Sequence, residues 1–213
     1  GFDLHPGVRM RRPLSPRQLD MLAQCLDLAV ISHDHYDHRH WGLVRRMLAV
    51  GKPVVLPDGP GRICAHRLAV RSRDLRDGAN VGPAGVLALP GWQRVRVRNY
   101  VHCVDVSGFR LMHAGDNTAW RVYDALAGGS RVDAAMVNCW AGFAPVFRRV
   151  RPRLMVTGHE NELGHVVSMR CDYDFTFRDL DRLGAPAYDP AGPADKPAAA
   201  VLCWGEDVIV PAT

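Results

Sequence analysis

Short apolar runs alternate along the chain with polar segments that contain proline and glycine. Runs that are short and rich in branched or small apolar residues are typical of buried strands, and they fall at 26–31, 54–56, 86–89, 133–138 and 154–157. Apolar residues at helical spacing predict helices over 15–24, 39–50, 62–70, 119–127 and 173–183. Strands and helices in succession predict an α/β fold.

One stretch alternates strictly between two kinds of side chain. From Arg94 to Val101, valine and arginine point to opposite faces, which predicts a strand with one face in solvent. We expect His102 to lie in the loop directly beyond this strand. A hairpin strand follows at 109–112, and two short runs around Gly205 predict a closing hairpin over 201–210.

The composition bounds the class of protein. The chain has 213 residues, 47% of them hydrophobic, which suits a single domain spanning 1–213. A net charge of +5 permits an anionic small-molecule substrate. No apolar run is long enough for a membrane span, and no signal peptide is evident. The six cysteines are scattered without a CxxC motif, so we expect reduced core thiols in a cytoplasmic protein.

The richest chemistry lies between the first predicted strand and the helix after it. The segment 32–40 reads SHDHYDHRH. His33 and His35 are two residues apart, so both point the same way in extended backbone, whereas Asp37 and His38 come after the chain turns. Imidazole and carboxylate together suit zinc, and also manganese or iron. Open α/β folds place their sites at the carboxyl ends of strands, which is where this loop lies.

This segment resembles the HxHxDH signature of the metallo-β-lactamase superfamily. The resemblance implies an αββα sandwich. Only about two dozen residues precede the first strand, so we expect either that this half of the sandwich is abbreviated or that the sequence is truncated. The resemblance also implies three later ligands in order: a histidine after a strand, an aspartate in a Gly-Asp pair and a late histidine. His102, Asp116 of Gly115-Asp116 and His159 of Gly158-His159 fit that order, and His113 competes with His102.

The resemblance divides the ligands between two metal ions, two Zn²⁺ or alternatively Mn²⁺ or iron. His33, His35 and His102 would hold one ion. Asp37, His38 and His159 would hold the other, and Asp116 would bridge them.

Three further side chains follow the last of these ligands. Glu160 and Glu162 are candidates to orient a metal-bound histidine. His165 contacts substrate, donates a proton or is structural; the sequence leaves these readings open.

The implied reaction is hydrolysis by a hydroxide that bridges the two metal ions, acting on an ester, lactone or phosphodiester. Asp37, Asp116 and His165 are the candidate catalytic residues, with Asp37 guiding the proton. His35 stands where the flavodiiron branch has glutamate, and Asp116 stands where true β-lactamases of the superfamily usually have cysteine, which disfavours both activities. The ascorbate-6-phosphate lactonase-like and phospholipase D-like branches are the most similar, through SHDHYDH and HAGD.

Two alternatives stay open. An iron-dependent thiol or persulfide dioxygenase can also use this signature and would contain about one iron per chain. A non-catalytic module could instead bind nucleic acid through the arginines, with a steep dependence on salt. The arginine-rich strand lacks the interleaved aromatic residues that favour this last reading.

Overall fold

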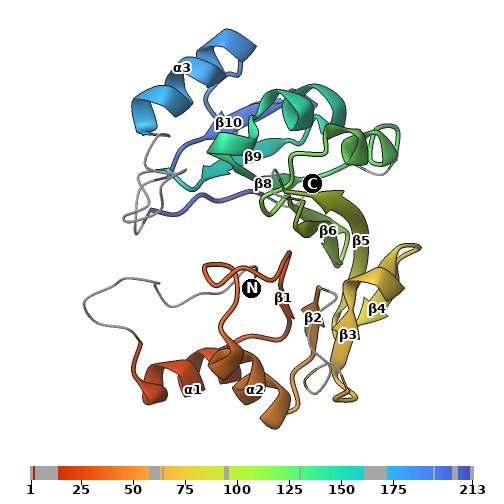
Figure 1. Ribbon diagram of the computed structural model, residues 1–213. Helices are drawn as coiled ribbons and strands as arrows, with labels where there is room; N and C mark the ends of the chain where they lie inside the picture. The colour runs from red at the N-terminus through yellow and green to blue at the C-terminus, as the bar shows by residue number, and fades with distance from the viewer. Residues whose placement is uncertain are drawn as a thin grey trace.

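The structure, a computed structural model, describes residues 2, 14–57, 63, 65–93, 96–129, 131–160, 172–193, 195–202 and 206–211. Its strands form two sheets, one of three strands and one of seven. In Figure 1 the small sheet lies in the lower part of the view with α1 (Pro16–Cys25) and α2 (Trp41–Ala49). The large sheet extends from β4, beside β3, up to β10, near α3 (Tyr173–Leu183).

The small sheet is parallel throughout. It contains β1 (Ala29–Val30), β2 (Val54–Leu56) and β3 (Ala69–Arg71) in that order. Helix α1 (Pro16–Cys25) begins with a capping box between Ser15 and Gln18, and α2 (Trp41–Ala49) connects β1 to β2. A helix is predicted over 62–70, but the described residues 65–68 form turns and a bend. Residues 69 and 70 belong to β3, which pairs with β2.

The large sheet combines an antiparallel half and a parallel half. Strands β4 (Ala79–Val81), β5 (Ala84–Trp92), β6 (Arg98–Val106) and β7 (Phe109–His113) are antiparallel neighbours. Strands β8 (Ala134–Asn138), β9 (Leu154–Gly158) and β10 (Ala198–Ala200) continue from β7 in parallel.

Helix α3 (Tyr173–Leu183) and several short helical turns accompany the large sheet. The turns are η1 (Ser72–Leu75), η2 (Trp120–Ala125), η3 (Cys139–Ala141) and the π-helical η4 (Val146–Val150). Among the described residues, no helix is long and apolar enough to cross a membrane.

Three clusters of buried side chains define the layers. The first joins α1 and α2 to the small sheet and includes Leu19, Val44, Met47 and Val54. The second lies between the sheets and includes Val30, Val55, Val86, Tyr100 and Val104. The third joins the large sheet to α3, η2 and η4 and includes Met155, Leu180, Tyr123 and Val146. The layers are therefore helix, sheet, sheet and helix, which confirms the αββα sandwich.

The strand directions bring several loops to one edge. Strand β5 is antiparallel to β6, and β6 is antiparallel to β7, so β5 runs in the same direction as β7, β8 and β9. The carboxyl ends of these four strands therefore meet at one edge of the large sheet. Residues after those ends, such as Gln93, Asp116 and His159, are placed there by the topology.

Two sequence predictions need correction here. His102 does not end its strand: β6 continues to Val106, and His102 pairs with Ala88 on one side and His113 on the other. Residues 99–104 are buried, because β6 is an interior strand of the sandwich, so the valine–arginine alternation does not mark its length. The predicted closing hairpin also fails, since the described residues 206–211 form no strand.

Candidate metal centre

Two groups of potential metal ligands lie side by side. One contains His33, His35 and Asp116, and the other contains His38, Asp116 and His159. Within each group the ligand atoms lie within 4.8 Å of one another. Asp116 belongs to both groups, so its carboxylate lies between the other members of each.

The histidine loop is held by its own backbone and by a neighbouring serine. The carbonyl oxygen of Ser32 accepts a hydrogen bond of 2.9 Å from the backbone N–H of Tyr100 on β6. The Oγ of Ser32 lies 2.9 Å from Nδ1 of His33, which leaves Nε2 of His33 facing Asp116. The ring centroid of His33 lies 4.6 Å from that of His35 and 4.1 Å from that of His38. The loop thus gathers three imidazoles without a regular element.

His40, the last histidine of the motif, serves the helix instead of the metal groups. Its Nδ1 accepts a hydrogen bond of 3.0 Å from the backbone N–H of Leu43 and caps α2. Partial burial, followed by the charges of Arg46 and Arg45, lowers the pKa of His40. A lowered pKa favours the neutral ring, which is the form that can accept this hydrogen bond.

Each carboxylate oxygen of Asp116 faces one amide donor and at least one histidine. The Oδ1 atom accepts a hydrogen bond of 2.6 Å from Nδ2 of Asn138, and it lies 3.4 Å from Nε2 of His38 and 3.6 Å from Nε2 of His159. The Oδ2 atom accepts one of 2.7 Å from Nε2 of Gln93 and lies 3.5 Å from Nε2 of His33.

These separations fit metal ligands. Ligand atoms bonded tetrahedrally to one zinc ion at about 2.0–2.1 Å lie about 3.3 Å apart. The distances from the Asp116 oxygens to the three histidine nitrogens are 3.4–3.6 Å, close to that value. Buried imidazole and carboxylate groups are also the donors that zinc, manganese and iron accept. The residues present therefore fit two divalent cations.

The backbone around Asp116 is tightly fixed. Its N–H donates a hydrogen bond of 3.0 Å to Oδ1 of Asn99, and Nδ2 of Asn99 donates to the carbonyl oxygen of Ala114. Gly115 has a φ of +54°, and a Cβ there would lie 2.4 Å from Oδ1 of Asn99 and 2.5 Å from Oγ of Ser32. The Gly-Asp pair is thus required by space as well as by conformation.

The electrostatics of the site favour an ionised Asp116. Burial by itself would raise the pKa of its carboxyl group. Hydrogen bonding and charge from His38, with charge from His159 and His33, outweigh burial and hold the pKa well below its usual range. A carboxylate that stays ionised while buried is suited to neutralise cations.

His159 is presented by the end of β9. It follows Gly158 and has a φ of +70°, in the left-handed region that non-glycine residues rarely adopt. Its ring centroid lies 5.1 Å from that of His38, with the planes nearly parallel. This unusual conformation turns the imidazole toward Asp116 and away from the strand direction.

Two predicted ligands lie outside both groups. His102 is fully buried, and its Nε2 lies 2.9 Å from Oγ of Ser72 on η1. Asp37 is adjacent to the second group, with its Oδ2 3.8 Å from Nε2 of His38. The structure therefore brings together five of the seven predicted ligands.

The remaining predicted residues follow His159. Glu160 is buried and accepts a hydrogen bond of 3.0 Å from Oγ1 of Thr176, so it ties the end of β9 to α3. Glu162 and His165 lie outside the described residues.

The sequence reasoning missed two residues that touch Asp116. Neither Asn138 nor Gln93 is among the ligands expected from the sequence. Gln93 follows Trp92, the last residue of β5, and Asn138 is the last residue of β8. Both strands end at the edge of the large sheet where Asp116 lies. A search of all polar residues at strand ends, not only histidine and the acidic residues, would have found them.

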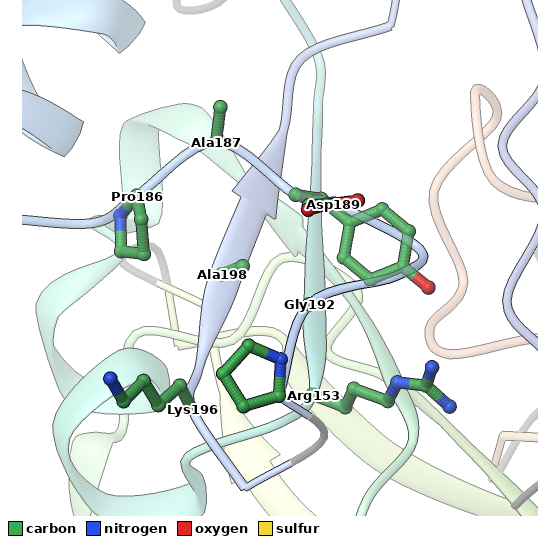
Figure 2. A pocket seen from close by; sticks show the side chains of 9 residues that line it. Arg153, Pro186, Ala187, Asp189, Gly192, Lys196 and Ala198 are labelled. Atoms are coloured by element: carbon green, nitrogen blue, oxygen red, sulfur yellow. The ribbon is translucent and has the colours of Figure 1, made fainter.

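A separate cavity lies at the other end of β9. It has a volume of about 240 Å³ and is lined by Arg153, Asp189 and Lys196 among others. Figure 2 shows the side chains of Arg153 and Lys196 extending away from each other. Arg153 also donates a hydrogen bond of 2.7 Å to the carbonyl oxygen of Pro211. The charged groups of Arg153 and Lys196 therefore do not converge on a common ligand. The cavity is lined by none of the predicted site residues.

Comparison with known proteins gives structural likenesses only. No protein-family model matches the chain, and no curated protein matches it by sequence. A solved structure of a possible metal-dependent hydrolase from Veillonella parvula has a TM-score of 0.64 and 12% identity, covering 96% of this chain and 87% of that one. The metallo-β-lactamase fold protein YhfI from Bacillus subtilis has a TM-score of 0.48 and 14% identity, covering 70% of each chain.

CmlA, a diiron β-hydroxylase from Streptomyces venezuelae, is also similar. Its TM-score is 0.51 at 19% identity, covering 74% of this chain and 41% of that one, and a mutant of CmlA gives 0.56 at 17% identity. The chain thus spans less than half the length of CmlA. At these identities the likenesses describe a shared fold.

Proposed function

Since the chain folds as the αββα sandwich that its sequence predicted, and shares its fold with a possible metal-dependent hydrolase, we propose that it is a dinuclear metal-dependent hydrolase of an ester, lactone or phosphodiester. The single observation that carries this proposal is Asp116, which is shared by two ligand groups. A shared carboxylate lowers the repulsion between two cations and fixes their spacing.

The chain's own residues would have distinct roles. His33 and His35 would hold one cation and His38 and His159 the other, with Asp116 between them. When bound, such a pair of cations supplies an activated water and polarises the scissile carbonyl or phosphoryl oxygen. We propose zinc as the metal, with manganese or iron as the alternatives at either position.

Asp37 is suited to handle the proton. Its side chain is 4% exposed and its Oδ2 lies 3.8 Å from Nε2 of His38, so it stands next to one cation position without belonging to either group. A carboxylate in that place would take the proton released from the attacking water.

The net charge of +5 is compatible with an anionic small molecule. We therefore propose a phosphodiester or a charged lactone as the first substrate classes to test, and we do not propose nucleic acid.

Metal content is the first test. Protein purified without chelators or a histidine tag should contain about two zinc or manganese ions per chain by elemental mass spectrometry. It should hydrolyse at least one member of a panel containing bis-(p-nitrophenyl) phosphate, p-nitrophenyl acetate and a phosphorylated lactone. The Asp116→Ala variant should lose turnover while its circular dichroism stays that of the wild type. Asp77→Ala, which alters an exposed turn, is the matched control.

A diiron oxygenase is the second candidate, and the likeness to the fold of CmlA favours it. In that case the protein would purify with iron and consume oxygen, and the hydrolase panel would give no product. A single iron with oxygen consumption would instead indicate the thiol or persulfide dioxygenase. Unchanged hydrolysis by Asp116→Ala would contradict the two-metal mechanism.

A further inference from the structure

Gln93 lies directly against the shared carboxylate. It is the first residue after β5 and reaches the site edge because β5 runs in the same direction as β7 and β9. Its side chain amide donates a hydrogen bond of 2.7 Å from Nε2 to Oδ2 of Asp116. The residue is only 8% exposed, so this contact is made inside the protein.

The other end of the same amide has no partner. Because an ionised carboxylate only accepts hydrogen bonds, the Nε2 end of Gln93 must face Asp116. The Oε1 atom is then buried and has no hydrogen-bond partner among the described residues. An amide oxygen buried without a partner is unfavourable, because it has lost its hydrogen bonds to water. A cation beside it would remove that penalty.

The His33 group shares one Asp116 oxygen with Gln93. It contains His33, His35 and Asp116, and Oδ2 is the Asp116 oxygen that faces both His33 and Gln93. The histidine expected to complete this group, His102, is instead 2.9 Å from Ser72. The oxygen of Ser72 donates to the carbonyl oxygen of Leu56 at 3.1 Å, so it accepts the N–H of His102. The Nε2 atom of His102 is therefore engaged on another element, and His102 belongs to neither ligand group.

We propose that Gln93 completes the metal site of His33, His35 and Asp116, with Oε1 as a metal ligand and Nε2 fixing the orientation of Asp116. This inference rests on the dinuclear centre proposed above. In this proposal Gln93 takes the place of His102, the ligand expected from the sequence. Glutamine is not one of the residue types in the ligand motif.

A glutamine ligand in place of a histidine makes the two cation positions unequal. A neutral amide oxygen is a harder and weaker donor than an imidazole nitrogen, and it suits manganese or iron(II) better than zinc. The position at His33 and His35 would therefore bind a cation more weakly than the position at His38 and His159. The centre would fill in two steps. The weaker position, at His33 and His35, would fill last and exchange its metal more readily.

Cobalt provides a direct test because its visible absorption reports the ligand set. Wild-type protein and variants would be produced in cobalt-supplemented medium and dialysed against stepwise lower free Co²⁺. Cobalt per chain would be counted by elemental mass spectrometry, and the d–d bands recorded at each step. The variants are Gln93→Ala and Gln93→His, with His102→Gln as the control for the rejected ligand.

The wild type should hold about two cobalt ions and lose one about tenfold more readily than the other. Gln93→Ala should keep about one. Gln93→His should keep two, bind the weaker one about tenfold more tightly and show altered d–d bands. His102→Gln should match the wild type in both count and spectrum. Gln93→His remains decisive if Gln93→Ala does not fold.

Three results would overturn the inference: two cobalt ions held by Gln93→Ala at wild-type affinity, loss of an ion from His102→Gln, or a wild-type spectrum in Gln93→His. None of these readouts uses turnover. A wild-type protein that shows the expected cobalt pattern but hydrolyses nothing would contradict the proposed function and leave this inference standing. A wild-type protein that binds no cation would overturn both.

Discussion

The Oγ atom of Ser72 lies 2.9 Å from Nε2 of His102, and both side chains are fully buried. His102 lies on the same face of β6 as Tyr100 and Val104, which belong to the cluster between the two sheets. The hydrogen bond therefore fixes the imidazole inside the sandwich, where it joins η1 to β6. Through its Nε2 atom, His102 makes a structural contact in this arrangement.

Replacing Ser72 with alanine should lower stability without altering the metal centre. The change removes the acceptor for His102 and the donor to the carbonyl oxygen of Leu56. Leaving such buried groups without these partners costs about 1–3 kcal/mol in the free energy of unfolding. Urea unfolding would measure this loss, and elemental mass spectrometry of the folded variant should give the wild-type metal content. A drop in bound metal with unchanged stability would contradict the structural role.

The outcome for His102 shows where sequence reasoning works and where it stops. Five residues of the two potential ligand groups could be predicted, because the histidine motif, Gly115-Asp116 and Gly158-His159 follow strand ends, and strand ends with the same direction meet at one edge. His102 could not be placed correctly, because the length of β6 is set by its pairing with β5 and β7. That pairing is a tertiary property.

The layers were also within reach of the sequence, whereas Gln93 was not. The alternation of short apolar runs and helical patterns led to the αββα order. Gln93 carries no charge and matches no ligand motif, and its place against Asp116 depends on where β5 ends. Only the assembled sheet brings the two together.

The described cysteines should differ sharply in reactivity. Cys25 is exposed, contrary to the expectation of core thiols, while Cys103 and Cys139 are buried. Burial raises the pKa of Cys103 to about 12, which keeps it a neutral thiol at pH 8, and the thiolate is the reactive form. Iodoacetamide at pH 8 should therefore modify Cys25 rapidly and spare Cys103 and Cys139, as read by peptide mass spectrometry.

Labelling in urea provides the control for this experiment, since unfolding should equalise the three thiols. Modification of Cys103 at the rate of Cys25 in the native protein would contradict the burial of β6.

Gly115 should tolerate no side chain. Its φ of +54° costs a non-glycine residue about 1–2 kcal/mol, and a Cβ would collide with Asn99 and Ser32. Gly115→Ala should therefore lose more stability than the backbone cost alone. It should also lose bound metal, because the backbone shift that relieves the collision moves Asp116. Gly108 is the matched control, since its φ is +87° but no atom lies within 4 Å of the added Cβ.

Urea unfolding and metal content of Gly115→Ala and Gly108→Ala separate the two effects. Gly108→Ala should show the backbone cost alone and keep its metal. Equal losses of stability in the two variants would mean that the contact with Asn99 and Ser32 is not limiting.

Removing metal should lower the melting temperature. A cation bound to the folded state at 100 times its dissociation constant adds about 2.7 kcal/mol. For a chain of this size, that corresponds to a shift of about 5–10 °C. Differential scanning fluorimetry with and without a chelator would measure the shift, and added Zn²⁺ should restore it. Asp116→Ala should melt at the same temperature in both conditions, and an equal chelator shift in that variant would place the metal elsewhere.

Asn138 should control how well Asp116 binds metal. It is 3% exposed and donates a hydrogen bond of 2.6 Å to Oδ1, the oxygen that faces His38 and His159. Without this donor the carboxylate can rotate away from the second group, and loss of such an orienting partner typically costs about 10–100-fold in metal affinity or activity. Asn138→Ala should therefore weaken the cation held by His38 and His159, measured by competition with a fluorescent zinc chelator.

The matched control for Asn138 is Asn80→Ala, which removes an exposed amide on β4. Asn80→Ala should bind metal as the wild type does. The Gln93 amide faces the other oxygen, so its cation should be less affected in Asn138→Ala than the cation of the second group. A uniform loss from both positions would show that the two oxygens of Asp116 do not act separately, and wild-type affinity at both would show that the Asn138 contact does not orient the carboxylate.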